Sequence, residues 1–134
     1  MVYGTVRTGG HVAVEVFLTA YSGQEAARAM DDLRAALRTC RAFPTLRGGG
    51  KWSDVRAAGQ LGEGDEELAF QAAMVPIPDT PALATEVRVV RVGTTLVTFA
   101  TNDMSGTTSQ VRTPRDLVHR QVAALQKVQA APVP

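Results

Sequence analysis

The sequence predicts an α+β protein: a single antiparallel β-sheet of about six strands, in the order β-β-α-β-β-β-β-α, with two helices packed on one face. Three observations favour this class. Alternating β-forming residues indicate hairpins near both ends of the chain, two segments carry apolar stripes at helical spacing, and strands occur in runs instead of alternating with helices. At 134 residues the chain is sized for one domain, over residues 1–131, with a short frayed tail over 132–134.

The first hairpin is expected over Val2–Tyr21. Apolar residues occupy alternate positions from Val12 to Leu18, and Thr8–Gly10 interrupts the pattern where a turn would lie. Strand-like sequence begins directly after Met1, so we expect the chain to be a trimmed piece of a longer protein.

A first helix is expected to begin at Ser22, because Ser22 and Glu25 have the spacing of a capping box. One apolar stripe follows at steps of three and four residues: Ala26, Met30, Leu33, Leu37 and Cys40. Cys40 is the only cysteine, and we expect it to be buried as a small apolar group. The alternative is a disulfide bond to a cysteine outside this fragment.

The middle of the chain is predicted as two strands. A short one is expected over Lys51–Val55, after the Gly48–Gly50 link. Glu67–Val75 suits a helix or a strand, and we choose a strand because prolines follow at once. The acidic run Glu63–Glu67 lacks the alternate-residue spacing of a calcium loop, so we expect it to be solvated.

The second hairpin is predicted over Thr85–Arg91 and Thr95–Phe99, with the turn at Gly93-Thr94. The first arm alternates between apolar and polar residues, and the second returns with β-forming residues. Beyond them, the polar loop Asn102–Arg112 has the length and composition of a binding loop, and equally of a disordered segment.

The last helix is expected to begin with Thr113 as N-cap and Pro114 in the first helical position. Its charged residues, His119 among them, are expected to form a solvated face. Its apolar stripe is Leu117, Val118, Val122, Leu125 and Val128.

The composition excludes several functions. Fourteen Lys and Arg against thirteen Asp and Glu leave a net charge of +1, which provides no field for holding nucleic acid or an anionic membrane. One cysteine and two histidines offer no metal-ligand spacing. The Gly48–Lys51 run lacks the Ser or Thr that a phosphate-binding loop needs directly after its Lys. We therefore expect no metal, no cofactor and no enzymatic activity.

Three segments together resemble a known family: HVAVEVFLTAYSGQEAARAMDDLRAAL, VRVVRVGTTLVTFA and LVHRQVAALQKV. They resemble the extracytoplasmic domains of actinobacterial lipoproteins, similar to the PknH-like extracellular sensor domains of receptor serine/threonine kinases. The resemblance implies an exported cell-envelope protein, tethered to the membrane by a lipidated cysteine or a transmembrane helix outside this fragment. It also implies a cleft between sheet and helices that binds a small ligand.

The resulting hypothesis is a non-catalytic ligand-binding or sensor-like domain, whose partner is an unknown small molecule or an envelope protein. We predict Trp52, Phe70 and Phe99 as apolar walls of the site and Arg112 as an anion contact. A first alternative is a protein-interaction module without a pocket, able to form a homodimer. A second is a cytosolic α+β enzyme, against which the scarcity of His and Cys argues.

Overall fold

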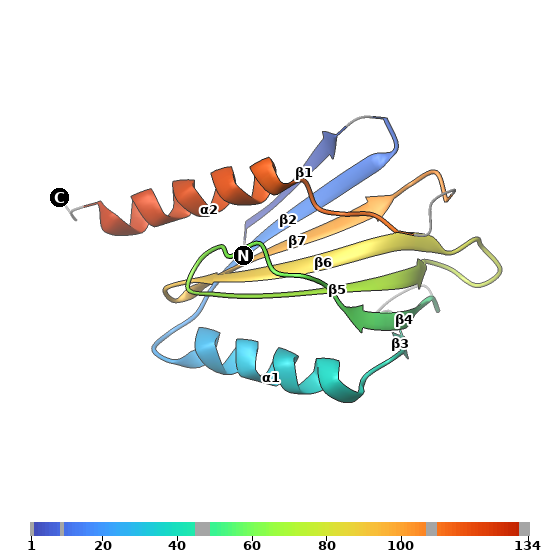
Figure 1. Cartoon of the computed structure of the whole chain (residues 1–134), viewed down its shortest axis with the longest axis horizontal. Coiled ribbons are helices and arrows are strands. Elements are labelled where there is room, and N and C mark those ends of the chain that lie inside the picture. The colour runs from blue at the N-terminus through green and yellow to red at the C-terminus, as the bar shows by residue number, and fades with distance from the viewer. Residues whose placement is uncertain (1, 9, 45–48, 107–109, 132–134) are drawn as a thin grey trace.

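The computed structural model describes residues 2–8, 10–44, 49–106 and 110–131. The expected frayed tail over 132–134, Gly9 of the first turn, Gly48 of the glycine link and residues 107–109 of the polar loop lie outside this range. The described residues form one sheet and two helices (Figure 1). The strands are β1 (Val2–Thr8), β2 (Val12–Ala20), β3 (Phe43–Pro44), β4 (Lys51–Ala57), β5 (Glu66–Val75), β6 (Leu83–Val92) and β7 (Thr95–Asp103), and the helices are α1 (Glu25–Thr39) and α2 (Arg115–Ala130).

The α+β class with a single antiparallel sheet is confirmed, with seven strands instead of about six. The additional strand is β3, two residues that follow the first helix and pair with the start of β4. The strand prediction for Glu67–Val75 is confirmed by β5, which pairs with both β4 and β6.

The strand order is β1-β2-β7-β6-β5-β4-β3, with antiparallel pairing throughout. Strands β3 to β7 therefore form a meander, and the N-terminal hairpin joins it through the pairing of β2 with β7. This order places β6 and β7 in the interior of the sheet, with β1 and β2 on one side of them and β5, β4 and β3 on the other.

The two helices cover opposite faces of the sheet. We call one the α2 face, defined by its core residues Val14, Val16, Val90, Val92, Val97 and Phe99, which cluster with Val118 and Val122 of α2. We call the other the α1 face, where Val89 and Leu96 cluster with Ala26 and Met30 of α1. Adjacent strand residues point to opposite faces, so the neighbours Val89 and Val90 contact different helices.

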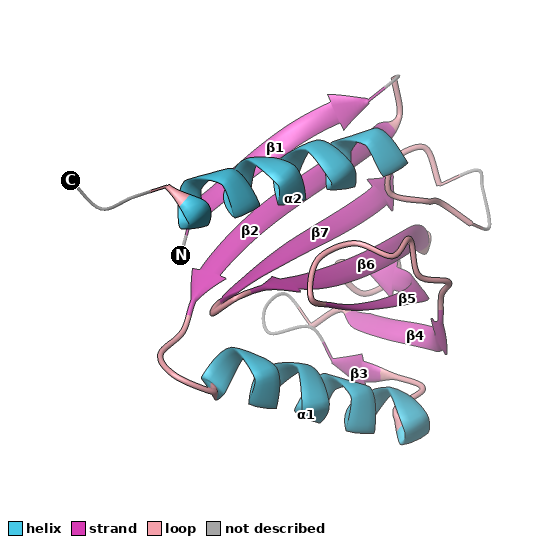
Figure 2. Ribbon diagram, turned by 60° about the vertical axis from the view of Figure 1, so that its left-hand side comes forward, coloured by secondary structure: helices cyan, strands magenta, loops and turns pink. Residues whose placement is uncertain are grey.

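The prediction that both helices pack on one face is therefore wrong. Strands β6 and β7 are apolar on both faces, and each face must be covered. Figure 2 shows α2 toward the β1–β2 side of the sheet and α1 toward β3 and β4.

Both helices begin without the expected side-chain caps. Gln24 is the N-cap of α1, and the N–H of Glu25 donates to the backbone carbonyl of Ser22 at 3.1 Å. Pro114 is the N-cap of α2, which leaves the hydroxyl of Thr113 free to bond elsewhere. Among the described residues, no helix has both the length and the apolar character needed to cross a membrane.

Cys40 lies at the C-cap of α1 and is half-buried, so the expectation of a fully buried thiol is wrong. Its thiol donates to the carbonyl of Ala42 at 3.4 Å. The helix ends one residue before it, and the backbone of Cys40 itself is extended, with φ −76° and ψ 123°.

Candidate functional site

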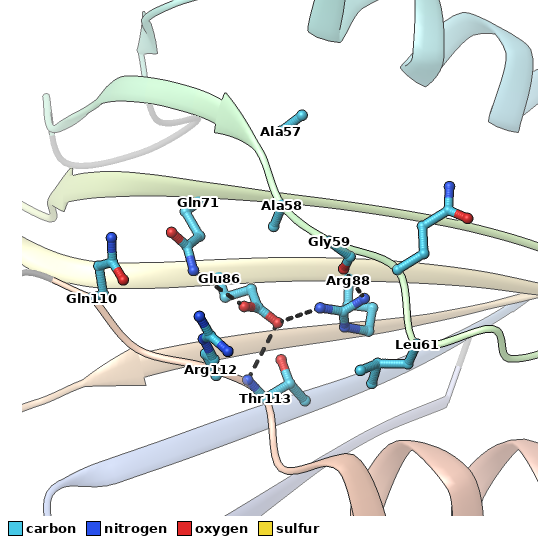
Figure 3. Close-up of a pocket in the computed structure, with 11 residues that line it drawn as sticks. Ala57, Ala58, Gly59, Leu61, Gln71, Glu86, Arg88, Gln110, Arg112 and Thr113 are labelled. Carbon is cyan, nitrogen blue, oxygen red and sulfur yellow. Dashed lines mark hydrogen bonds and ion pairs between the residues drawn. The ribbon is translucent and has the colours of Figure 1, made fainter.

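A pocket of about 370 Å³ lies on the α2 face, beside the apolar area that α2 covers. Four parts of the chain form it (Figure 3). One wall is the segment 57–61, which begins at the last residue of β4. The floor comes from β5 and β6, and the other wall is the segment 110–113 before α2. The lining residues are Ala57, Ala58, Gly59, Gln60, Leu61, Gln71, Glu86, Arg88, Gln110, Arg112 and Thr113.

The floor contains what we call the buried ionic cluster: Glu67, Glu86 and Arg88. The Arg88 side chain is 5% exposed and pairs with both carboxylates, each 2% exposed. Nη1 donates to Glu67 Oε2 and to the carbonyl of Gly59, the latter at 2.9 Å, and Nη2 donates to Glu86 Oε1 at 2.9 Å. Two negative charges surround one positive charge, so the cluster carries a net charge of −1 when both carboxyls are ionised.

Glu67 holds one wall of the pocket in place. Its Oε1 accepts hydrogen bonds from the backbone N–H groups of Leu61 at 2.9 Å, Gly62 at 2.8 Å and Glu63 at 3.1 Å. Burial raises the pKa of Glu67, but the backbone donors of Leu61 and Glu63, together with Arg88, outweigh it and hold the pKa below its usual value. Glu67 is thus an ionised structural anchor.

The same loop is tied to α2 by a second contact. Nδ1 of His119 lies 2.8 Å from Oε1 of Glu63. The expectations that the acidic run and His119 would be solvated are therefore only partly right: Glu67 is buried, and His119, although exposed, has a partner.

Glu86 links the floor to the opposite wall. Its Oε1 accepts the backbone N–H of Thr113 at 3.3 Å, and its Oε2 accepts Nε2 of Gln71 at 3.4 Å. The Thr113 hydroxyl shares a buried hydrogen bond of 2.8 Å with the hydroxyl of Thr101 on β7. Both polar walls are therefore fastened to the sheet by buried side chains.

Arg112 and Gln110 line the pocket and are exposed. Arg112 makes no hydrogen bond or ion pair within the described part of the chain, so its five N–H donors are available to a ligand. The arrangement suits recognition of a small polar molecule: fixed donors and acceptors on the floor and an unpaired cation at the opening.

The structure brings only one of the four sequence-predicted site residues to this pocket, Arg112. Phe99 is fully buried in the core under α2. Phe70 and Trp52 lie on the α1 face, where Trp52 stacks on Phe43 with ring centroids 5.4 Å apart. These three rings are part of the packing and do not line the pocket.

Sequence reasoning missed the residues of the buried ionic cluster. Glu86 and Arg88 alternate with valines on β6, the same pattern that a solvent-facing side of a strand would show. One signal in the sequence could have identified them. Glu86 and Arg88 have opposite charges and are two residues apart, so they lie on the same face of the strand. The apolar residues around them indicate a strand that is buried on both faces.

A second cavity of about 350 Å³ lies between α1 and the other side of the 57–61 segment. It is lined mainly by apolar side chains, with Arg34 and Arg38 of α1 beside them. Within the described ranges, no three His, Cys, Asp or Glu side chains gather in a way that could hold a metal ion.

Comparisons of this chain with protein-family models, with curated proteins and with solved structures found no match.

Proposed function

We propose that this chain is a non-catalytic binding domain for a small polar ligand. The observation that carries the proposal is the pocket on the α2 face, in which a buried, hydrogen-bonded floor faces the unpaired Arg112 at the opening. A concave pocket with a small number of fixed polar groups is typical of small-molecule binding sites.

A binding role also fits the way the charges are used. Glu67 is engaged with backbone donors and Arg88, and Glu86 with Arg88 and Thr113. The pKa of Glu67 is lowered, which makes it a poor proton carrier near neutral pH. The charged side chains of the floor thus hold the pocket together.

The experiment is a thermal-shift screen with polar metabolites that cover acidic, neutral and basic compounds, using wild type and Gln71→Ala. Compounds that bind the pocket raise the melting temperature of wild type and do so less in the variant. Gln126→Ala, an exposed position of α2 outside the pocket, is the matched control and should respond like wild type. If no compound distinguishes Gln71→Ala from Gln126→Ala, the pocket is not a binding site.

We further propose that the domain works outside the cytoplasmic membrane, as part of a cell-envelope protein with a lipid or transmembrane anchor. The sequence resemblance to extracytoplasmic domains of actinobacterial lipoproteins and PknH-like sensors supports this placement. The test is mass spectrometry of the native amino terminus in fractionated host cells. A lipid-modified cysteine upstream of Val2 in the membrane fraction is the expected result, and an unprocessed cytosolic chain would contradict it.

A second candidate function is a protein-interaction module, favoured by the position of β1. This seven-residue strand pairs with β2 on one side and ends the sheet on the other. Its outer backbone N–H and C=O groups could pair with a strand of a second copy. Sedimentation at increasing concentration would show a dimer if this function holds, and a monomer at every concentration if it does not.

A further inference from the structure

The floor of the pocket contains a buried donor without an acceptor. Nη1 and Nη2 of Arg88 are both engaged, but Nε is buried and has no hydrogen-bond partner among the described residues. Nε and Nη2 share one edge of the planar guanidinium group, so the Nε–H points along the side that also faces Glu86. A buried N–H without an acceptor costs free energy. Because Arg88 lines the pocket, an acceptor atom of a ligand that reaches Nε would recover this free energy.

Beside this donor lies an acceptor with spare capacity. The side chain of Glu86 is 2% exposed, and its Oε2 receives only the long 3.4 Å hydrogen bond from Gln71. An ionised carboxylate has about four lone-pair positions, and the three hydrogen bonds from Gln71, Arg88 and Thr113 use three of those of Glu86. Oε2 can therefore accept a further donor from a ligand.

A hydroxyl group combines both properties in one small group. Its oxygen can accept a hydrogen bond from an N–H such as Nε of Arg88, and its hydrogen can be donated to a carboxylate oxygen such as Oε2 of Glu86. An ammonium group only donates, so it would leave the Arg88 N–H without an acceptor. A carboxylate only accepts, and on the floor it would meet the net negative charge of the buried ionic cluster.

At the opening of the pocket, by contrast, a carboxylate is favoured. Arg112 is exposed and unpaired, and a guanidinium binds a carboxylate with two parallel hydrogen bonds. We propose that the ligand is a small hydroxylated carboxylic acid, such as a hydroxy acid or a sugar acid, with a hydroxyl on the floor and its carboxylate at Arg112. This proposal rests on the proposed binding function and assigns the ligand class of the same pocket.

The test uses isothermal titration calorimetry with hydroxy acids of increasing size, each paired with a neutral analogue: lactate with propane-1,2-diol, gluconate with sorbitol, and glucuronate with glucose. Glucosamine is the cationic probe. At least one acid should bind about tenfold more tightly than its neutral partner, the size expected for a charge-assisted hydrogen bond. Glucosamine should bind more weakly than glucose.

Arg112→Gln should reduce the affinity of the acid to that of its neutral partner. Arg115→Gln removes the same charge from an exposed position outside the pocket and should leave the preference intact. The floor contact is read separately by NMR: the buried Arg88 Nε–H resonance should shift when the acid is added, also in Arg115→Gln.

Two results overturn the ligand class: no hydroxy acid binds, or glucosamine binds at least as tightly as the acids. Binding of an acid with no shift of the Arg88 Nε–H resonance overturns the floor contact. The metabolite screen described above decides the proposed function independently, because a hit of any other class that depends on Gln71 would leave the binding function standing.

Discussion

The carboxylate of Glu67 lies 2.8 Å from the backbone nitrogen of Gly62, so a buried side chain of β5 holds the loop that forms one wall of the pocket. The same carboxylate pairs with Arg88 on β6. Wall and floor therefore share one anchor, and a change at Glu67 should affect both.

Glu67→Gln is expected to destabilise the fold by about 3–5 kcal/mol, the range for breaking a buried ion pair on one side. The amide would leave Arg88 with one carboxylate and would turn an N–H group toward the loop donors. Urea unfolding measures the loss. Glu66→Gln is the control, because Glu66 is 24% exposed, and it should cost clearly less. Equal losses would show that Glu67 has no special anchoring role.

Stability should fall in acid. The Glu66 pKa is lowered by hydrogen bonds from Arg34 and Arg91, and the Glu67 pKa is lowered by its backbone donors and Arg88 despite its burial. Because both values lie below the ordinary 4.5, the unfolded chain binds more protons, and this contribution to stability is present above pH 4.5 and lost as pH falls through the folded values. Urea midpoints across this pH range should decline for wild type and decline less for Glu67→Gln. If the urea midpoints of wild type and Glu67→Gln declined in parallel, ionised Glu67 would not be a source of the acid sensitivity.

Gly64→Ala is expected to cost about 2–5 kcal/mol, from left-handed backbone strain and from overpacking. Gly64 has a φ of +66°, and a Cβ there would lie 2.4 Å from Cγ1 of Val90 and 2.7 Å from the carbonyl oxygen of Arg91. Gly62→Ala is the matched control, since its φ is +79° but its Cβ would meet nothing within 4 Å. Thermal or urea unfolding should separate the two variants. If Gly64→Ala and Gly62→Ala lose the same stability, the contact of the new Cβ at position 64 with β6 costs nothing, and the prediction is wrong.

The hydroxyl pair of Thr101 and Thr113 predicts a non-additive result. Thr113→Val alone should cost about 1–3 kcal/mol, because it leaves the buried Thr101 hydroxyl without its partner. The double variant Thr101→Val/Thr113→Val should be more stable than the sum of the single losses indicates. A double-mutant cycle from urea unfolding provides the coupling energy, and a value near zero would show that the hydroxyls do not depend on each other.

Phe99→Ala and Trp52→Ala should differ in how much stability they cost and in whether they affect the pocket. Phe99 is fully buried under α2, and its truncation should cost about 3–5 kcal/mol. Trp52 is half-buried on the α1 face, so its truncation should cost less and leave the Arg88 Nε–H resonance in place. A shifted resonance in Trp52→Ala would mean that the α1 face influences the pocket.

The elements were predictable from sequence because their signals are local. The hairpin at Gly93-Thr94 and the apolar stripe of α1 follow from residue spacing alone. The placement of the two helices on opposite faces was not predicted. It depends on the neighbouring apolar pairs Val89-Val90 and Leu96-Val97, in which one residue packs against α1 and the other against α2. These contacts form only once the sheet is assembled.

The candidate site was harder to predict for the same reason. Arg112 was identified from its place in a long polar loop, and it does line the pocket. Glu86 and Arg88 looked like the exposed side of a strand, because the loop that buries them comes from a different part of the chain. Burial of charge is a tertiary property, and strand periodicity carries no information about it.

The pairing of β2 with β7 also has a consequence for how the chain reaches its native state. Every contact in the β3–β7 meander joins neighbouring strands, but Val12 must find Asp103 across most of the sequence. Such distant pairings slow folding, because the intervening chain loses entropy before the strands are in register. During synthesis the N-terminal hairpin therefore remains without its partner strand until β7 has been made, and until then the edge of β2 is an unpaired strand edge of the kind that is prone to aggregation.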